Sequence, residues 1–164
     1  MVRLNPYDPN LGVLVPIVAK RITEYAREHA KEMDPLAVTR GVMVPLWAQD
    51  PSVLVVAMVN TEGTVVGHAV ATVTSDGVAA ALNVMQTQAD GAVGDAVKRT
   101  LDFARTWAVE EVNPALVAAG RKPVTRLAFV TGKNEKAWEH DYGLKLERRV
   151  LGLALDGEES AHGG

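Results

Sequence analysis

The first part of the chain alternates apolar and charged positions with the spacing of an amphipathic helix. Apolar or aromatic side chains recur every three or four residues over 11–29, with basic and acidic residues between them. Pro16 must then lie in the first helical turn, where its missing N–H is tolerated. Asp34 before Pro35 is typical of a helix start, so we expect a second helix from there to about Leu46.

The middle of the chain changes to the pattern of β-strands. Val53–Val59 is a continuous apolar run that predicts a buried strand, and the turn 61–64 contains a glycine. Val65–Thr74 and Val78–Met85 predict two more strands, separated by the turn 75–77. Three strands joined by tight turns imply an antiparallel meander.

The helical pattern then returns over 93–112, where the apolar positions Val93, Val97, Leu101, Ala104, Ala108 and Val112 share one face. We expect Asn113-Pro114 to bend or end this helix. A short turn over 115–119 follows, and Gly120 closes it.

The last part of the chain predicts a strand over Val124–Val130, a short helix from Asn134 to His140 and a final strand over Leu144–Leu155. Together with a short first strand, Val2–Leu4, the predicted order is β-α-α-β-β-β-α-β-α-β. Such an order favours an α/β fold with a mixed central sheet and helices on both faces. We expect one domain over 1–155 and a flexible, acidic, Gly-rich tail over 156–164.

Composition narrows the function classes. The formal net charge of the 164 residues is −3, so a nucleic-acid or anionic-membrane partner is not expected. The absence of cysteine excludes disulfides, thiolate metal sites and thiol catalysis. No histidine pair has metal-ligand spacing, so we expect no metal. The first residues do not resemble a signal peptide, and a cytoplasmic protein is therefore expected, or a virion-associated one if it is phage-encoded.

Three segments carry a family resemblance. The first segment is the opening Val2–Asp8, and the second is the strand segment Val65–Ala69 with its Gly67. The third is the late segment Asn134–Trp138, followed by Tyr142-Gly143-Leu144. They resemble the GNAT superfamily of acetyl-CoA-dependent N-acetyltransferases, and the last segment is similar to small bacteriophage-encoded GNAT-like proteins. The resemblance covers residues 2 to about 155.

The resemblance implies a GNAT-like (acyl-CoA N-acyltransferase) fold and acetyl-CoA as cofactor. Pantetheine would lie where two strands splay apart, and backbone N–H groups at a helix N-terminus would hold the diphosphate. The candidate diphosphate loop is the stretch 86–94, which matches the family pattern through Gln88 and Gly91 in one register and through Gly94 in the other. The implied cofactor-binding residues are Val84, Gln86, Gln88, Gly91, Ala92, Gly94 and Asn134.

Two features of this stretch leave alternatives open. Asp90 either repels a diphosphate at short range, or is a turn or cap residue that points away from any ligand. Asn83 and Gln86 interrupt an apolar strand, and they either bond the pantetheine amides or mark the outward face of the strand.

The candidate catalytic residues are His68, Glu139 and Tyr142. His68 lies in a strand near the expected cleft and titrates near neutrality, although a structural role facing solvent or a helix is the alternative. Glu139 stands where the family has its general-acid tyrosine, and Tyr142 directly precedes the helix-ending glycine. The alternative for Tyr142 is a packing residue with a solvated hydroxyl group.

These observations favour transfer of an acetyl group to an amine of a small molecule or a protein. The alternative is a catalytically silent GNAT-fold binding or structural protein, for example a bacteriophage virion or assembly component, with a homo-oligomer or a larger protein assembly as the partner. Trp107 and Trp138 are expected in the core. Trp47 is expected in a loop, near the substrate or in an interface.

Overall fold

The sheet has the predicted mixed character. The computed structural model describes residues 1–75, 80–91 and 95–129, all within the compact unit formed by residues 1–130. Its strands are β1 (Val2–Arg3), β2 (Val53–Val59), β3 (Val65–Ser75), β4 (Ala80–Ala89) and β5 (Val124–Phe129), in the spatial order β1-β2-β3-β4-β5. The pairs from β1 to β4 are antiparallel, which confirms the meander, whereas β4 and β5 are parallel.

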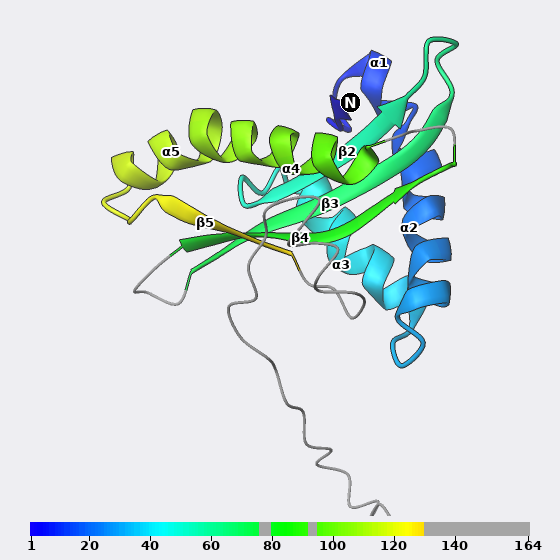
Figure 1. Ribbon diagram of the computed structural model, residues 1–164, viewed down its shortest axis with the longest axis horizontal. Coiled ribbons are helices and arrows are strands. Elements are labelled where there is room, and N and C mark those ends of the chain that lie inside the picture. Colours follow the sequence, from blue (N-terminus) through cyan, green and yellow to red (C-terminus); the bar gives the residue numbers. More distant parts are fainter. Residues whose placement is uncertain (76–79, 92–94, 130–164) are drawn as a thin grey trace, which may run out of the picture. The chain divides into compact units, whose positions relative to one another are not determined.

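Helices cover both faces of this sheet (Figure 1). The helices α2 (Val15–His29) and α3 (Pro35–Trp47) pack on one face, and α4 (Ala96–Trp107) packs on the other. Asp34 caps α3 as predicted, because its side chain accepts a hydrogen bond from the Leu36 N–H. The predicted late helix from Asn134, the last strand over 144–155, Trp138 and the tail over 156–164 lie outside the described residues, and the extent of the domain to 155 stays a prediction.

The first predicted helix is divided in two. A single turn, α1 (Pro9–Gly12), is capped by Asp8, and α2 begins three residues later. Pro16 explains the division, because it has no N–H to donate to the carbonyl of Gly12 and continue the first turn into the second helix. Pro16 instead occupies the first turn of α2, as predicted.

The predicted break at Asn113-Pro114 is accommodated within a continuous helical segment. A π-helical turn (Ala108–Val112) joins α4 to α5 (Asn113–Ala118). In a regular α-helix a proline ring clashes with the carbonyl four residues earlier, and the wider π-helical turn gives room for the ring of Pro114. Asn113 also fixes the start of β5, since its side chain accepts from the Val124 N–H (2.6 Å) and donates to the Val124 carbonyl (3.1 Å).

Alternation along the strands divides the interior into two cores. In β2, Leu54, Val56 and Met58 face α4, while Val55 and Ala57 face α2 and α3. Trp107 is buried in the α4-side core, as the sequence predicts. Each fully buried large apolar side chain stabilises the fold by about 1.5–3 kcal/mol. The two cores therefore fix both helical layers on the sheet.

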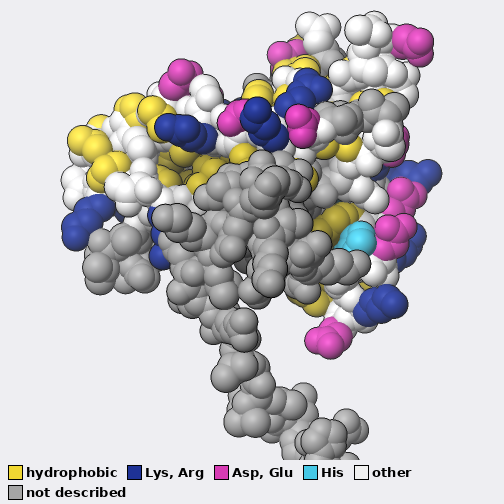
Figure 2. All heavy atoms as spheres, viewed as in Figure 1, with side chains coloured by type: hydrophobic (Ala, Val, Ile, Leu, Met, Phe, Trp, Pro, Cys, Tyr) yellow, Lys and Arg dark blue, Asp and Glu magenta, His cyan; other side chains and the backbone are white. Residues whose placement is uncertain are grey.

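The described surface mixes charges of both signs. Figure 2 shows Lys and Arg side chains interspersed with Asp and Glu on the face in view, and apolar side chains gathered over α5 and the adjoining turn. Val109 and Val117 are exposed there. No helix within the described ranges has the length and apolar character needed to cross a bilayer.

Gly67 provides a test of how tightly β3 and β4 are packed. A Cβ at this position would lie 2.6 Å from the Gln88 carbonyl oxygen and 2.8 Å from the Met58 sulfur. We predict that Gly67→Ala destabilises the protein by about 1–3 kcal/mol in urea unfolding, because backbone atoms must move.

Gly41→Ala is the matched control, since nothing lies within 4 Å of a Cβ built there, inside α3. It should stabilise the protein by about 0.5–1 kcal/mol, because alanine is the better helix former. Equal effects of the two variants would contradict the close approach at Gly67.

Candidate functional site

One extra residue in β4 decides which side chains reach the α2 side of the sheet. Val70 of β3 faces Gln86 and Ala71 faces Val84, so Met85 has no opposing residue and forms a β-bulge. Without the bulge, strict alternation would place Gln86 on the same apolar face as Val84. With it, Gln86 shares a face with Val70, on the side of α2.

Gln86 and His68 form a buried polar pair on this side. His68 has no exposed surface, and its Nε2–H donates to the Gln86 Oε1 at 3.2 Å. Tyr25 of α2 stands edge-on to the imidazole, with ring centroids 6.0 Å apart. The sequence left open whether His68 faces solvent or a helix, and the structure places it beneath α2.

The environment keeps His68 neutral. Burial lowers the pKa of His68 below its usual 6.5; the Gln86 hydrogen bond raises this pKa and the nearby Arg21 charge lowers it. The Nδ1 atom is buried and has no hydrogen-bond partner among the described residues. An imidazole in this state has an unprotonated nitrogen available near neutral pH.

Strand β4 continues beyond the described part of β5. The described ladder between the two strands ends where Val84 faces Phe129, yet β4 runs on to Ala89. In this last part β4 stays paired with β3, since Gln88 faces His68 and Ala89 faces Gly67. The stretch after the bulge therefore has β3 on one edge, while its other edge has no partner among the described parts of β5.

An ion pair ties the end of β4 to α2. The guanidinium of Arg21 donates to both carboxylate oxygens of Asp90, at 3.1 and 2.7 Å, and to the Val65 carbonyl at 3.1 Å. The hydrogen bonds from Arg21 hold the pKa of Asp90 below its usual value. The Asp90 charge is therefore neutralised by a residue 69 positions earlier in the chain, an arrangement that neither alternative in the sequence analysis included.

The expected diphosphate loop needs a correction. We predicted that the strand ends at Met85, but β4 continues through Gln86, Thr87 and Gln88 to Ala89. The reason is pairing with β3, which continues over these polar residues because the bulge moves Gln86 and Gln88 off the apolar face. Gly91 follows the strand and is exposed.

The remaining predicted site residues fall into three groups. Val84 is fully buried, so only its backbone can meet a ligand. Asn83 donates to the Thr74 hydroxyl at 2.7 Å and is thus engaged within the sheet. The other predicted residues lie outside the described ranges, and their roles stay predictions: Ala92, Gly94, Asn134, Glu139 and Tyr142.

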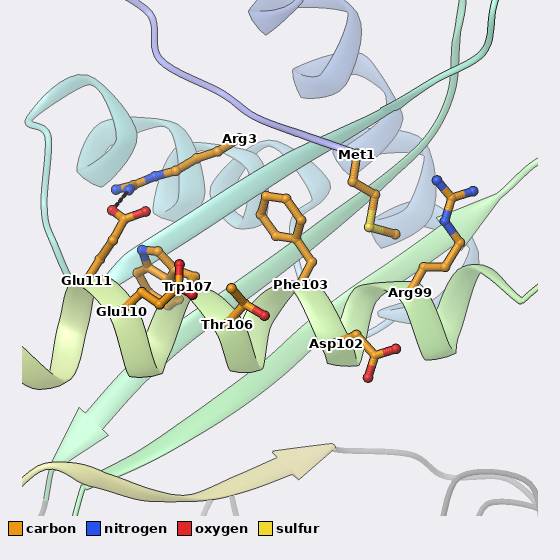
Figure 3. A pocket seen from close by; sticks show the side chains of 9 residues that line it. All are labelled: Met1, Arg3, Arg99, Asp102, Phe103, Thr106, Trp107, Glu110 and Glu111. Carbon is orange, nitrogen blue, oxygen red and sulfur yellow. Dashed lines mark hydrogen bonds and ion pairs between the residues drawn. The ribbon is translucent and has the colours of Figure 1, made fainter.

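Two cavities occur elsewhere in the described part. The larger, about 560 Å³, lies between the start of the chain and α4, and in it Arg3 is paired with Glu111 (Figure 3). The Arg3 guanidinium also lies 5.7 Å from the centre of the Trp107 ring. The smaller, about 260 Å³, lies between residues 3–6 and the end of α3. Neither contains the polar residues of β4.

Trp47 is the last residue of α3 and not a loop residue as predicted. It is half-exposed, and its ring meets Tyr7 edge-on with centroids 5.8 Å apart. The Tyr7 hydroxyl donates to the Trp47 carbonyl at 2.7 Å.

Arg21 and Tyr25 are the residues that sequence reasoning missed at this site. Tyr25 falls at one of the apolar or aromatic positions of the helix predicted over 11–29 and Arg21 at one of the charged positions between them, and the spacing of four residues puts the two side chains one turn apart. Nothing in the sequence pairs Arg21 with Asp90, so only the tertiary structure reveals it. No three His, Asp or Glu residues within 1–75, 80–91 and 95–129 come together as metal ligands.

Comparison of whole structures identifies the fold. The chain is similar to a structure described as a predicted acetyltransferase with acetyl-CoA from Clostridium acetobutylicum, with a TM-score of 0.61 and 13% identity over 87% of this chain and 90% of that one. A ribosomal-protein-alanine N-acetyltransferase from Brucella melitensis gives a TM-score of 0.56 and 14% identity, covering 86% and 92% of the chains. Glucosamine-6-phosphate N-acetyltransferase from Arabidopsis thaliana gives a TM-score of 0.56 and 9% identity, over 85% of this chain and 94% of that one.

These likenesses confirm the predicted GNAT-like α/β fold. No family model matches the sequence, and no curated protein matches it either. At such low identity the likeness concerns the fold, and function has to be argued from the site. Nothing in the comparisons bears on the expected similarity to bacteriophage proteins.

The buried neutral His68 predicts a pH dependence of stability. Its pKa is lower in the folded state than in the unfolded chain, so the unfolded chain binds more protons between these two values. Stability should therefore fall as the pH drops below about 6.5, by at most about 1.4 kcal/mol per pH unit for this one group, and level off below the folded-state pKa. His68→Gln, measured by urea unfolding between pH 4.5 and 8, should lack this component.

His29→Gln is the control, because this exposed histidine contacts the same Tyr25 with its ring tilted, the centroids being 4.5 Å apart. If the His68→Gln variant and the wild type lose stability in parallel on acidification, His68 is not held neutral by the fold.

Proposed function

We propose that this protein is an N-acetyltransferase that takes its acetyl group from acetyl-CoA and transfers it to an amine. The observation that carries the proposal is the bulge in β4, after which Gln86 pairs with the buried His68 on the α2 side of the sheet and Asp90 pairs with Arg21 of α2. The fold shared with solved acetyltransferases supports the same activity.

The residues present fit this cofactor. Nδ1 of His68, on the α2 side of the sheet, and the hydroxyl of Thr87, on the α4 side, are buried polar atoms without a hydrogen-bond partner among the described residues. Buried polar atoms without partners mark places where a ligand can supply the missing hydrogen bond. The Asp90 charge, which would oppose a diphosphate, is neutralised by Arg21. In the proposal, β4 from Gln86 to Gly91 holds the pantetheine and diphosphate parts.

Acetyl-CoA would supply a thioester whose carbonyl carbon is attacked by the nitrogen of the amine. His68 is the candidate base in this proposal, because its neutral imidazole can accept the proton that the amine loses. Since the ring is fully buried, substrate binding has to open a path to Nδ1. Gln86 orients the imidazole through Nε2. Glu139 and Tyr142 stay the candidates for protonating the leaving thiolate.

A second candidate function, a binding or assembly protein without catalysis, is favoured by the outer side of α3. This helix exposes Leu36, Val44 and Trp47 and carries one charged side chain, Arg40. Exposed apolar residues along one helix are typical of surfaces that contact another protein. This candidate predicts stable association with a partner chain and no response to acetyl-CoA.

The direct test is calorimetric titration of acetyl-CoA and CoA into the purified protein, followed by an assay for free thiol with a panel of amines. We predict saturable binding with a dissociation constant in the range of about 1 μM to 1 mM, which is usual for enzyme substrates. Thiol release should require an amine from the panel. No heat and no thiol would contradict the enzymatic proposal and leave the binding function as the better candidate.

If catalysis is found, its pH dependence tests the role of His68. We predict that kcat/KM falls on acidification with a midpoint below pH 6.5, because burial lowers the pKa of the proposed base. In His68→Gln the rate should fall by about 10²–10⁴-fold and this acidic limb should disappear. A variant that keeps the rate and the limb would remove His68 from catalysis while leaving the acetyltransferase activity in place.

A further inference from the structure

The ion pair between Arg21 and Asp90 indicates how the candidate site could bind a negatively charged ligand. We propose that Arg21 is the residue that binds a phosphate group of acetyl-CoA, and that Asp90 is an internal competitor that holds Arg21 in place and weakens this binding. The inference rests on the proposed function, since it concerns the same cofactor. It assigns the recognition of phosphate to a residue of α2.

Hydrogen bonding leaves Arg21 able to bind a second anion. A guanidinium has five N–H donors, and three of them bond to described atoms, two to Asp90 and one to the Val65 carbonyl. Two donors have no partner among the described residues. Arginine is well suited to bind carboxylate and phosphate oxygens at the same time, because its donors are fixed in one plane.

Burial shows which partner can move. The Arg21 side chain is 19% exposed and is held by the Val65 carbonyl, whereas the Asp90 side chain is 56% exposed. A carboxylate that is more than half exposed is readily solvated when it leaves the pair. The guanidinium thus forms the fixed side of the pair and the carboxylate the replaceable side.

The pair of Arg21 and Asp90 lies at the end of the part of β4 that follows the bulge. The Asp90 N–H donates to the Val66 carbonyl at 2.8 Å, so the backbone of β4 stays bonded to β3 as far as Asp90. Gly91 follows and is exposed, and the twelve-residue helix α4 begins at Ala96. A ligand that runs along β4 toward α4 would therefore pass Arg21 and Asp90 together.

Arg21 and Asp90 carry opposite charges, so removing one or the other should change the affinity for acetyl-CoA in opposite directions. Removing the Asp90 charge releases Arg21 to a phosphate and removes a repulsion, so binding should tighten. Removing Arg21 leaves Asp90 uncompensated, so binding should weaken. If Arg21 serves only to neutralise Asp90, its removal has no effect once Asp90 is already neutral.

The experiment measures the affinity of acetyl-CoA for the full chain and for the variants Asp90→Asn, Arg21→Gln and the double variant Arg21→Gln/Asp90→Asn. At low ionic strength we expect Asp90→Asn to bind about three- to tenfold more tightly than wild type, and Arg21→Gln to bind more weakly by a similar factor. The double variant should bind more weakly than Asp90→Asn. These differences should shrink in 0.5 M salt, where charges are screened within about 4 Å.

Two controls separate phosphate recognition from general charge and folding effects. Lys20 and Glu24 form an exposed ion pair on α2, with 3.8 Å between the charged groups. Lys20→Gln removes one positive charge, as Arg21→Gln does, and Glu24→Gln removes one negative charge, as Asp90→Asn does. Neither control variant should alter the affinity for acetyl-CoA. S-acetylpantetheine lacks the phosphates and should bind all variants alike. Arg21→Lys keeps the charge and should recover part of the loss, which a folding defect would not show.

The outcomes distinguish this inference from the proposed function. Tighter binding by Asp90→Asn that depends on Arg21 and on the phosphates supports the inference, even if the wild type alone shows no binding. Wild-type binding that is unchanged or weakened by Asp90→Asn overturns it, and so does equal binding by Asp90→Asn and the double variant. Failure of both wild type and Asp90→Asn to bind acetyl-CoA overturns the proposed function and this inference together.

Discussion

Between Val84 and Gln86, strand β4 carries one residue that no residue of β3 opposes, and this bulge decides which layer each later side chain faces. Before Met85, the apolar positions of β4 complete the core under α4. After it, Gln86 and Gln88 turn toward α2, and Ala89 packs against the α4-side core. The bulge thus moves Gln86 and Gln88 from the side of α4 to the side of α2, where Gln86 accepts the hydrogen bond of His68.

The polar groups gathered on this side are balanced in charge. His68 is neutral because it is buried, Gln86 is neutral by chemistry, and Arg21 and Asp90 cancel one another. A balanced group can lie between a helix and a sheet at little cost, since each polar atom is either hydrogen-bonded or uncharged. The same balance suits a ligand with an uncharged reacting end and an anionic far end, such as a CoA thioester.

Much of the fold could be predicted from the sequence, because burial imposes a period on each element. The strands β2 and β3, the start of α3 and the core position of Trp107 all follow from apolar spacing and capping residues. The end of β4 could not be predicted in this way, because Gln86–Ala89 alternates polar and small residues and is held by pairing with Gly67–Val70.

The site was predicted less well for the same physical reason. Family resemblance selected Gln86 and His68, but their mutual hydrogen bond depends on the bulge, which has no signature in the local sequence. The neutralisation of Asp90 depends on a residue in a helix far away in the chain. Interactions between distant segments depend on how the helices pack on the sheet, and no local sequence pattern predicts them.

The central claim is that the part of β4 after the bulge is the ligand-binding part of this protein. A titration of nitrogen-15-labelled protein with acetyl-CoA, followed by NMR, tests it directly. The account predicts that the largest amide shifts fall on Met85–Gly91 and that the side-chain signal of Arg21 moves with them. Shifts concentrated instead on Phe103 and on the indole of Trp107, around the cavity beside α4, would contradict it.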